Sequence, residues 1–278
     1  MTMKRIISFA LTAVLIIILS GGCTKKDNPP ALPPPNSMSI DFSNFLISNK
    51  SAGIESTSAK VNWSYAASTA AVWNIILTVN LVIPVASFQK AMNNTPVYID
   101  NKTWQWNYTV NVIGASYNAR LTGQIGTSDV KWEMYVSKDG IDAFDEFLWF
   151  SGTSALDGKS GQWILNVNHT FVEPFLQIDW AISGDKPGSI KYTYVRDLKD
   201  NRTTDWFKNS SIEYGLTSNT LDAYYTVHYN ASTTAADFKD VYIEWSTANH
   251  NGHIKAADYF QDNIWHCWDT NGYDVTCN

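Results

Sequence analysis

The chain is short of the side chains that most often carry chemistry. Its 278 residues include three cysteines and five histidines, and 17% of them are charged. Acidic residues outnumber basic ones, 26 to 20, and no basic stripe stands out. We therefore expect no nucleic-acid partner, because phosphate binding depends on clustered Lys and Arg. A Gly-x-Ser-x-Gly sequence is also absent, which excludes the nucleophile elbow of the α/β hydrolases.

Two short segments look like ligand-binding motifs but do not match them. Five residues rather than four separate Gly152 from Gly158, so a hairpin turn is the better interpretation than a phosphate-binding loop. His250 and His253 have only Asn-Gly between them and lack a third spaced ligand, so we expect a polar loop there. The sequence therefore predicts no metal site and no cofactor.

Carboxylates are numerous, but no pair of them is distinctive. In any acidic barrel, at least one pair of carboxyl groups lies about 5 to 10 Å apart, which is the spacing that glycoside hydrolysis uses. We expect the protein not to be an enzyme, and we keep a carboxylate-dependent hydrolase as a second alternative with unknown catalytic residues. The carboxylates considered are Glu133, Asp142, Asp145, Glu146, Glu173 and Asp179.

A hydrophobic run of 14 residues, 6–19, follows Lys4 and Arg5 near the start of the chain. It is short for a membrane span, and small residues follow it, as a cleavable export signal requires. The next residues, Ser20-Gly21-Gly22-Cys23, resemble the lipobox of bacterial lipoproteins. The resemblance implies cleavage after Gly22 and attachment of acyl chains through Cys23. An ordinary secretory signal and an uncleaved membrane helix are the alternatives.

Residues 24–37 are polar and proline-rich, which favours an extended polyproline conformation. We expect a signal peptide over 1–22, a lipidated tether over 23–37 that lifts the protein off the membrane, and one globular domain over 38–278. Thr24, rather than Asp, follows the cysteine. By resemblance to lipoproteins of two-membrane bacteria, this implies an outer-membrane protein on the periplasmic or the outer side.

The other two cysteines, Cys267 and Cys277, form an even pair in a compartment that favours oxidation. They flank Asn271-Gly272, a strong hairpin signal. We predict a C-terminal disulfide hairpin in which a three-residue loop, 271–273, places Cys267 directly opposite Cys277. Closing so short a loop stabilises the protein by at most about 3 kcal/mol.

From residue 103 onward, apolar residues alternate with polar ones in segment after segment, and turn residues separate the segments. This pattern is typical of strands, and the short connections exclude parallel crossovers. We predict a mainly β fold with a minor α component: an antiparallel up-and-down meander closing into a barrel or half-barrel. One or two N-terminal helices should pack on or in it. Among the clearest alternating segments are 104–112, 130–136, 163–167, 190–194, 223–227 and 241–245.

The eighteen residues 66–83 carry no charge. A helix that is apolar nearly all round is a buried helix, so we predict a helix that fills the barrel. A strand is the alternative, because apolar residues alternate from Trp73 to Ile83. Pro84 should end either element and begin a second short helix over 84–92.

The chain holds twelve tryptophans, and most of them occupy strand positions typical of a core. Trp104, Trp106 and Trp149 lie where aromatic residues crowd, and they are our candidates for lining a cavity or an exposed binding face. We expect a hydrophobic ligand, such as a lipid, or a structural role at the outer membrane. A carbohydrate-binding surface lipoprotein with an oligosaccharide ligand is the alternative. Lipid-carrying lipoproteins with half-barrel folds are similar in layout, helix first and meander after, which is an analogy of fold alone.

Overall fold

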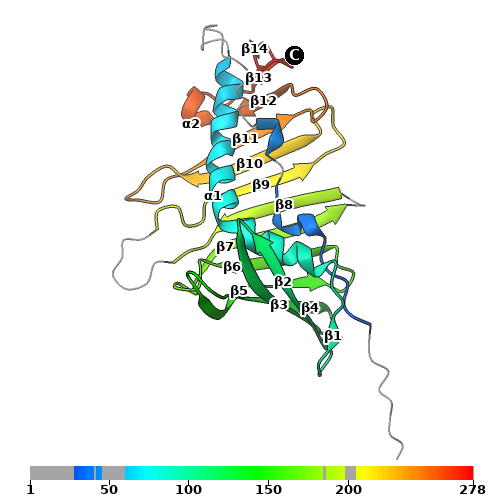
Figure 1. Ribbon diagram of the computed structural model, residues 1–278. Coiled ribbons are helices and arrows are strands. Elements are labelled where there is room, and N and C mark those ends of the chain that lie inside the picture. The colour runs from blue at the N-terminus through cyan, green and yellow to red at the C-terminus, as the bar shows by residue number, and fades with distance from the viewer. Residues whose placement is uncertain (1–27, 41, 46–59, 184–185, 198–204, 278) are drawn as a thin grey trace, which may run out of the picture.

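The computed structural model describes residues 28–40, 42–45, 60–183, 186–197 and 205–277. The predicted signal peptide and Cys23 lie outside these residues. The described part of the chain forms one long helix and one large curved sheet (Figure 1).

Fourteen strands of the described chain form this sheet, and each pairs only with its neighbours in sequence. The first seven are β1 (Val97–Tyr98), β2 (Thr103–Val112), β3 (Ala115–Ile125), β4 (Asp129–Lys138), β5 (Phe144–Ala155), β6 (Ser160–Asn166) and β7 (Pro174–Ser183). The others are β8 (Lys186–Tyr194), β9 (Ser211–Leu216), β10 (Ala223–Asn230), β11 (Phe238–Trp245), β12 (Gly252–Lys255), β13 (His266–Trp268) and β14 (Asp274–Val275). All pairings are antiparallel.

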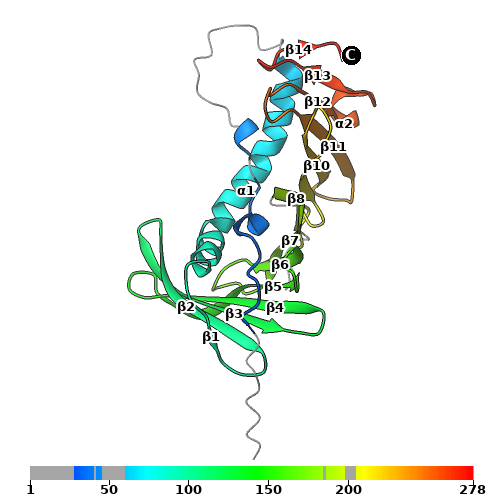
Figure 2. The same ribbon diagram turned by 90° about the vertical axis from the view of Figure 1, so that its right-hand side faces the viewer.

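The sheet curls without closing, because β1 and β14 lie at its two ends and do not pair with each other (Figure 2). Twist accumulates along so many strands, and a curled sheet is the expected result. The prediction of an antiparallel meander in the form of a half-barrel is confirmed.

In the long strands, most apolar residues are buried and alternate with polar ones. In β4, Val130, Trp132 and Met134 are buried, whereas Lys131 and Glu133 between them are exposed. Side chains alternate between the two faces of a strand, so this spacing yields one apolar and one polar face. The apolar face packs against the long helix, where the Phe88 ring meets Phe150 and Trp163 edge-on.

The long helix, α1 (Val61–Ala91), crosses the open side of the half-barrel. It contacts β2 and β3 toward one end of the sheet and β12, β13 and β14 at the other. It carries no charged residue from Val61 to Gln89, and its length and composition would also suit a membrane span. Here it packs on the sheet, which confirms the predicted N-terminal helix. It is not buried all round inside a barrel, because Val72, Ile75 and Val79 are 52%, 65% and 72% exposed.

The prediction that Pro84 separates two helices is wrong, because α1 continues through it. A proline inside a helix removes one backbone hydrogen bond and costs about 3 kcal/mol. Pro84, Leu81 and Phe88 are all buried against the protein, and this packing offsets the cost. The last turns of α1 bend away from the axis of the others (Figures 1 and 2).

The N-terminus of α1 is capped by the other end of the chain. The Asp274 carboxylate in β14 accepts hydrogen bonds from the backbone N–H groups of Val61 and Asn62, both at 3.0 Å. The Asn62 amide donates to the carbonyl of Cys267 at 2.9 Å. Backbone N–H groups at a helix start lack partners within the helix, and a carboxylate is favoured there. The C-terminal hairpin therefore holds the start of α1.

The predicted Cys267–Cys277 disulfide is present, with 5.3 Å between the Cα atoms. The predicted register is wrong, because Cys267 lies opposite Val275 and Trp268 lies opposite Asp274. The loop is 270–272, one residue earlier than expected. The backbone N–H of Asp269, just before the loop, donates to the carbonyl of Tyr273, just after it, at 2.9 Å. Gly272 has φ +82°, and glycine is favoured at the last position of a three-residue hairpin loop. The glycine, and not the cysteine pair, sets the register.

The N-terminal segment runs between α1 and the sheet. It includes two 3-10 turns, η1 (Pro35–Met38) and η2 (Ser43–Phe45). Pro33, Met38 and Phe45 are buried, and the Trp163 indole donates to the Ser37 hydroxyl at 3.2 Å. Residues 33–37, which we assigned to the tether, are thus packed on the protein and do not form a free stalk.

Candidate ligand-binding cleft

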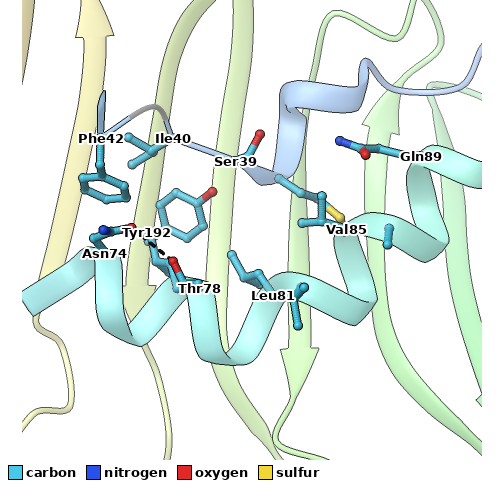
Figure 3. Close-up of a pocket in the computed structure, with 13 residues that line it drawn as sticks. Ser39, Ile40, Phe42, Asn74, Thr78, Leu81, Val85, Gln89 and Tyr192 are labelled. Carbon is cyan, nitrogen blue, oxygen red and sulfur yellow. Dashed lines mark hydrogen bonds between the residues drawn. The ribbon is translucent and has the colours of Figure 1, made fainter. Parts of the chain in front are cut away.

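An open cleft of about 300 Å³ lies between α1, the N-terminal segment and β8 (Figure 3). Thirteen residues from these three elements line it. They are Met38, Ser39, Ile40, Phe42, Asn74, Leu77, Thr78, Leu81, Val82, Val85, Ala86, Gln89 and Tyr192.

The helix supplies one wall of the cleft. Its lining residues begin at Asn74 and recur at intervals of three and four up to Gln89, which is the spacing of one helix face. Most of them are aliphatic. One side of the uncharged stretch of α1 therefore packs on the sheet, and an adjacent side faces the cleft.

Tyr192 of β8 closes the cleft on the side of the sheet. The residue is 0% exposed, and its hydroxyl group has no hydrogen-bond partner among the described residues. Figure 3 shows the ring in the space between α1 and the Ile40 segment. Burial raises the pKa of this phenol well above its usual value, so it is a neutral group that can both donate and accept a hydrogen bond.

The other polar groups of the cleft lie at its edges. The Thr78 hydroxyl donates to the Asn74 amide oxygen at 3.1 Å, and Ser39 and Gln89 are exposed. None of the thirteen lining residues is charged. The cleft thus combines apolar walls, an uncharged rim and one buried hydroxyl group, which are the features of a small-molecule site.

The three tryptophans singled out from the sequence do not line this cleft. Trp106 and Trp149 are 2% and 8% exposed, and Trp104 is half-buried. Trp106 packs on Trp132, Trp149 lies against Phe147, and Trp104 meets Tyr98 edge-on. They lie on β2 and β5, so the structure does not gather them into one site.

Four of the six carboxylates singled out from the sequence, Glu133, Glu146, Glu173 and Asp179, accept hydrogen bonds from nearby side chains. Glu146 accepts two hydrogen bonds from Arg120, at 2.8 and 2.7 Å, and this contact lowers the pKa of the carboxyl group. The pair borders a second, polar hollow of about 340 Å³ outside β2 to β5. A general acid needs a raised pKa, so Glu146 is unsuited to that role.

Other members of the set are also engaged. Glu173 pairs with Arg196 at 2.9 Å, and the Gln162 and Gln177 amides donate to Asp179. These contacts satisfy the carboxylates without forming a shared cleft.

His250 and His253 have separate partners, Asn44 and Glu244, at 2.9 and 3.0 Å. Over the residues that the structure describes, no three His, Cys, Asp or Glu side chains gather as a metal site.

Sequence reasoning missed Tyr192 and the N-terminal wall of the cleft. Tyr192 occupies an alternating strand position like those of its neighbours Ile190 and Tyr194, and nothing in that pattern distinguishes a cleft residue from a core residue. Residues 38–40 and Phe42 fall within the predicted domain, but nothing in the sequence indicates that they pack beside α1.

Fold and site together define an open antiparallel half-barrel with a helix across its mouth and an uncharged cleft beneath that helix. Comparisons with protein families, curated proteins and solved structures give no match for this chain. The function is therefore argued from the geometry of the cleft.

Proposed function

We propose that this chain is an exported, lipid-anchored protein of the outer membrane that binds the hydrophobic part of a small ligand without catalysing a reaction. The observation that carries the proposal is the apolar cleft with the buried, unpartnered Tyr192 hydroxyl group. Seven buried side-chain polar atoms of the described residues lack a hydrogen-bond partner, and Tyr192 is the one of these residues that lines the cleft. Each such group costs about 1 to 3 kcal/mol of stability. A ligand that hydrogen-bonds to Tyr192 would remove this cost.

The proposed location rests on the resemblance of Ser20-Gly21-Gly22-Cys23 to a lipobox. One acyl chain binds a membrane only marginally, whereas two or three hold a protein firmly. Labelling cells with an alkyne analogue of palmitate should mark the wild-type protein and leave the Cys23→Ser variant unmarked and released from membranes. Label on the variant would contradict an anchor at this residue.

Ligand binding is tested with two valine substitutions on the same helix. Val82 lines the cleft, whereas Val79, three residues earlier, is 72% exposed. Val82→Trp should fill the cleft, and Val79→Trp should place the same added bulk in solvent. Both are made in the mature chain with Cys23→Ser, so that no acyl anchor competes for the cleft.

The probe is N-phenyl-1-naphthylamine, an uncharged dye that fluoresces in apolar sites. We expect saturable binding to the parent and to Val79→Trp with Kd values within twofold of each other, and at least tenfold weaker binding to Val82→Trp. Circular dichroism checks that both variants fold. Equal binding by the two variants, or no saturable binding by the parent, would refute the proposal.

The carbohydrate-binding alternative gains no matching observation. The exposed aromatic side chains of the described residues, Phe171, Trp206, Tyr242 and Tyr259, lie in four different segments. One face of the Tyr259 ring is covered by Tyr65, which stacks on it with 3.7 Å between the ring centroids. This hypothesis and the hydrolase hypothesis stay predictions.

A further inference from the structure

Resting on the proposed function, we infer that the ligand is an uncharged amphiphile with a single aliphatic chain and an alcohol, ester or ketone oxygen that reaches Tyr192. The size of the cleft, its lack of charge and its one buried hydroxyl group each narrow the class of ligand.

The size of the cleft excludes bulky lipids. At about 30 Å³ for a group the size of a water molecule, a volume of about 300 Å³ holds on the order of ten such groups. Ligand pockets range from about 300 to 1,000 Å³, so this cleft is among the smallest. One short chain fills it, and the two chains of a diacyl lipid would not both lie inside.

The described lining of the cleft carries no charge, which disfavours an ionised head group inside it. No Lys, Arg or His is among the thirteen lining residues. An ion removed from water without an opposite charge costs several kcal/mol, and one phenol does not compensate for that. A carboxylate or phosphate inside the cleft is therefore disfavoured.

The Tyr192 hydroxyl group selects for an uncharged oxygen. An alcohol can both donate to and accept from a phenol, and an ester or ketone carbonyl can accept from it. A plain alkane would leave the hydroxyl unpartnered, which keeps its desolvation cost. An oxygen on the chain thus gives the ligand an advantage that depends on Tyr192 alone.

The test compares 1-decanol with decanoate at pH 8, where the acid is ionised. Both have ten carbon atoms, and both are titrated against N-phenyl-1-naphthylamine bound to the mature chain with Cys23→Ser. Decanol should displace the dye at a concentration at least tenfold lower than decanoate. In Tyr192→Phe, which keeps the ring, decanol should bind five- to tenfold more weakly while the dye binds as before.

The outcomes separate this inference from the proposed function. If the dye binds but decanol and decanoate displace it equally well, the inference about an uncharged ligand is wrong. The proposed hydrophobic site then still stands. Unchanged decanol binding in Tyr192→Phe overturns the role of the hydroxyl group and with it the inference. Absence of dye binding to the parent refutes the proposed function itself. A thermal melt of Tyr192→Phe at or above that of the parent shows that the variant is folded.

Discussion

Replacing Tyr192 by Phe should make the ligand-free protein more stable. The substitution removes one buried hydroxyl group that has no hydrogen-bond partner among the described residues and retains a ring that is 0% exposed. Burying an unpaired hydroxyl costs about 1 to 3 kcal/mol in protein mutational data. The small void left by the missing oxygen atom destabilises the protein and offsets part of this gain in stability. We expect the free energy of unfolding to rise by about 1 kcal/mol.

The assay is urea unfolding of residues 23–278 with Cys23→Ser and an intact disulfide. In a protein of this size, about 1 kcal/mol also raises the Tm by roughly 2 to 4 °C. Tyr108→Phe is the matched control, because the Tyr108 hydroxyl donates to the carbonyl of Ser87 at 2.6 Å. Losing that bond should lower the free energy of unfolding by about 1 kcal/mol.

Opposite signs for the same chemical change would identify Tyr192 as a group held for binding rather than for stability. A loss of 1 kcal/mol or more in Tyr192→Phe would mean that the hydroxyl group is paired in solution. The reasoning about the cleft would then fail at its first step.

Three further outcomes are expected of the same mature chain in urea unfolding. Asp274→Ala removes the cap from the start of α1 and should cost about 1 kcal/mol; no change would show that the cap does not form in solution. Replacing Cys267 and Cys277 together by Ser should cost at most about 3 kcal/mol, and a larger loss would mean that the hairpin supports more than α1 and its own strands. Burial and neighbouring carboxylates raise the pKa values of Tyr194 and Tyr224 to about 12, so the native state holds these protons more tightly than the unfolded chain. Their stabilising contribution is present below pH 10 and should be lost between pH 10 and 12; a flat stability profile over that range would contradict it.

The strands were predictable because each carries its own signal. Trp132 and Met134 alternate with Lys131 and Glu133, and this period of two survives in the folded sheet. Short connections then fix the antiparallel order. Open or closed curvature was left undecided, because it depends on how twist adds up over all fourteen strands of the described chain.

The two errors have different causes, tertiary packing at Pro84 and local turn geometry at Gly272. Pro84 breaks an isolated helix, but here it lies inside a buried face of α1. Gly272 shifts the hairpin loop by one residue from the register chosen for Cys267 and Cys277. At Pro84 the deciding contacts come from residues outside the motif, whereas at the hairpin the motif was right and the position of its glycine in the loop was misjudged.

The cleft itself was out of reach of the sequence. It requires Met38, Val82 and Tyr192, which come from three separate segments, to meet around a space that no side chain fills. Alternation and composition indicate which residues are buried on folding, but they do not show where the buried side chains leave a cavity.

The cap on α1 joins residues 213 positions apart, so it also sets an order of events. A chain that emerges from its N-terminus presents α1 early and Asp274 among the last residues. Such distant pairings form late, because the intervening chain must be ordered first. During folding, the first turn of α1 therefore stays uncapped until the final hairpin forms, and a chain that lacks β14 never receives that cap.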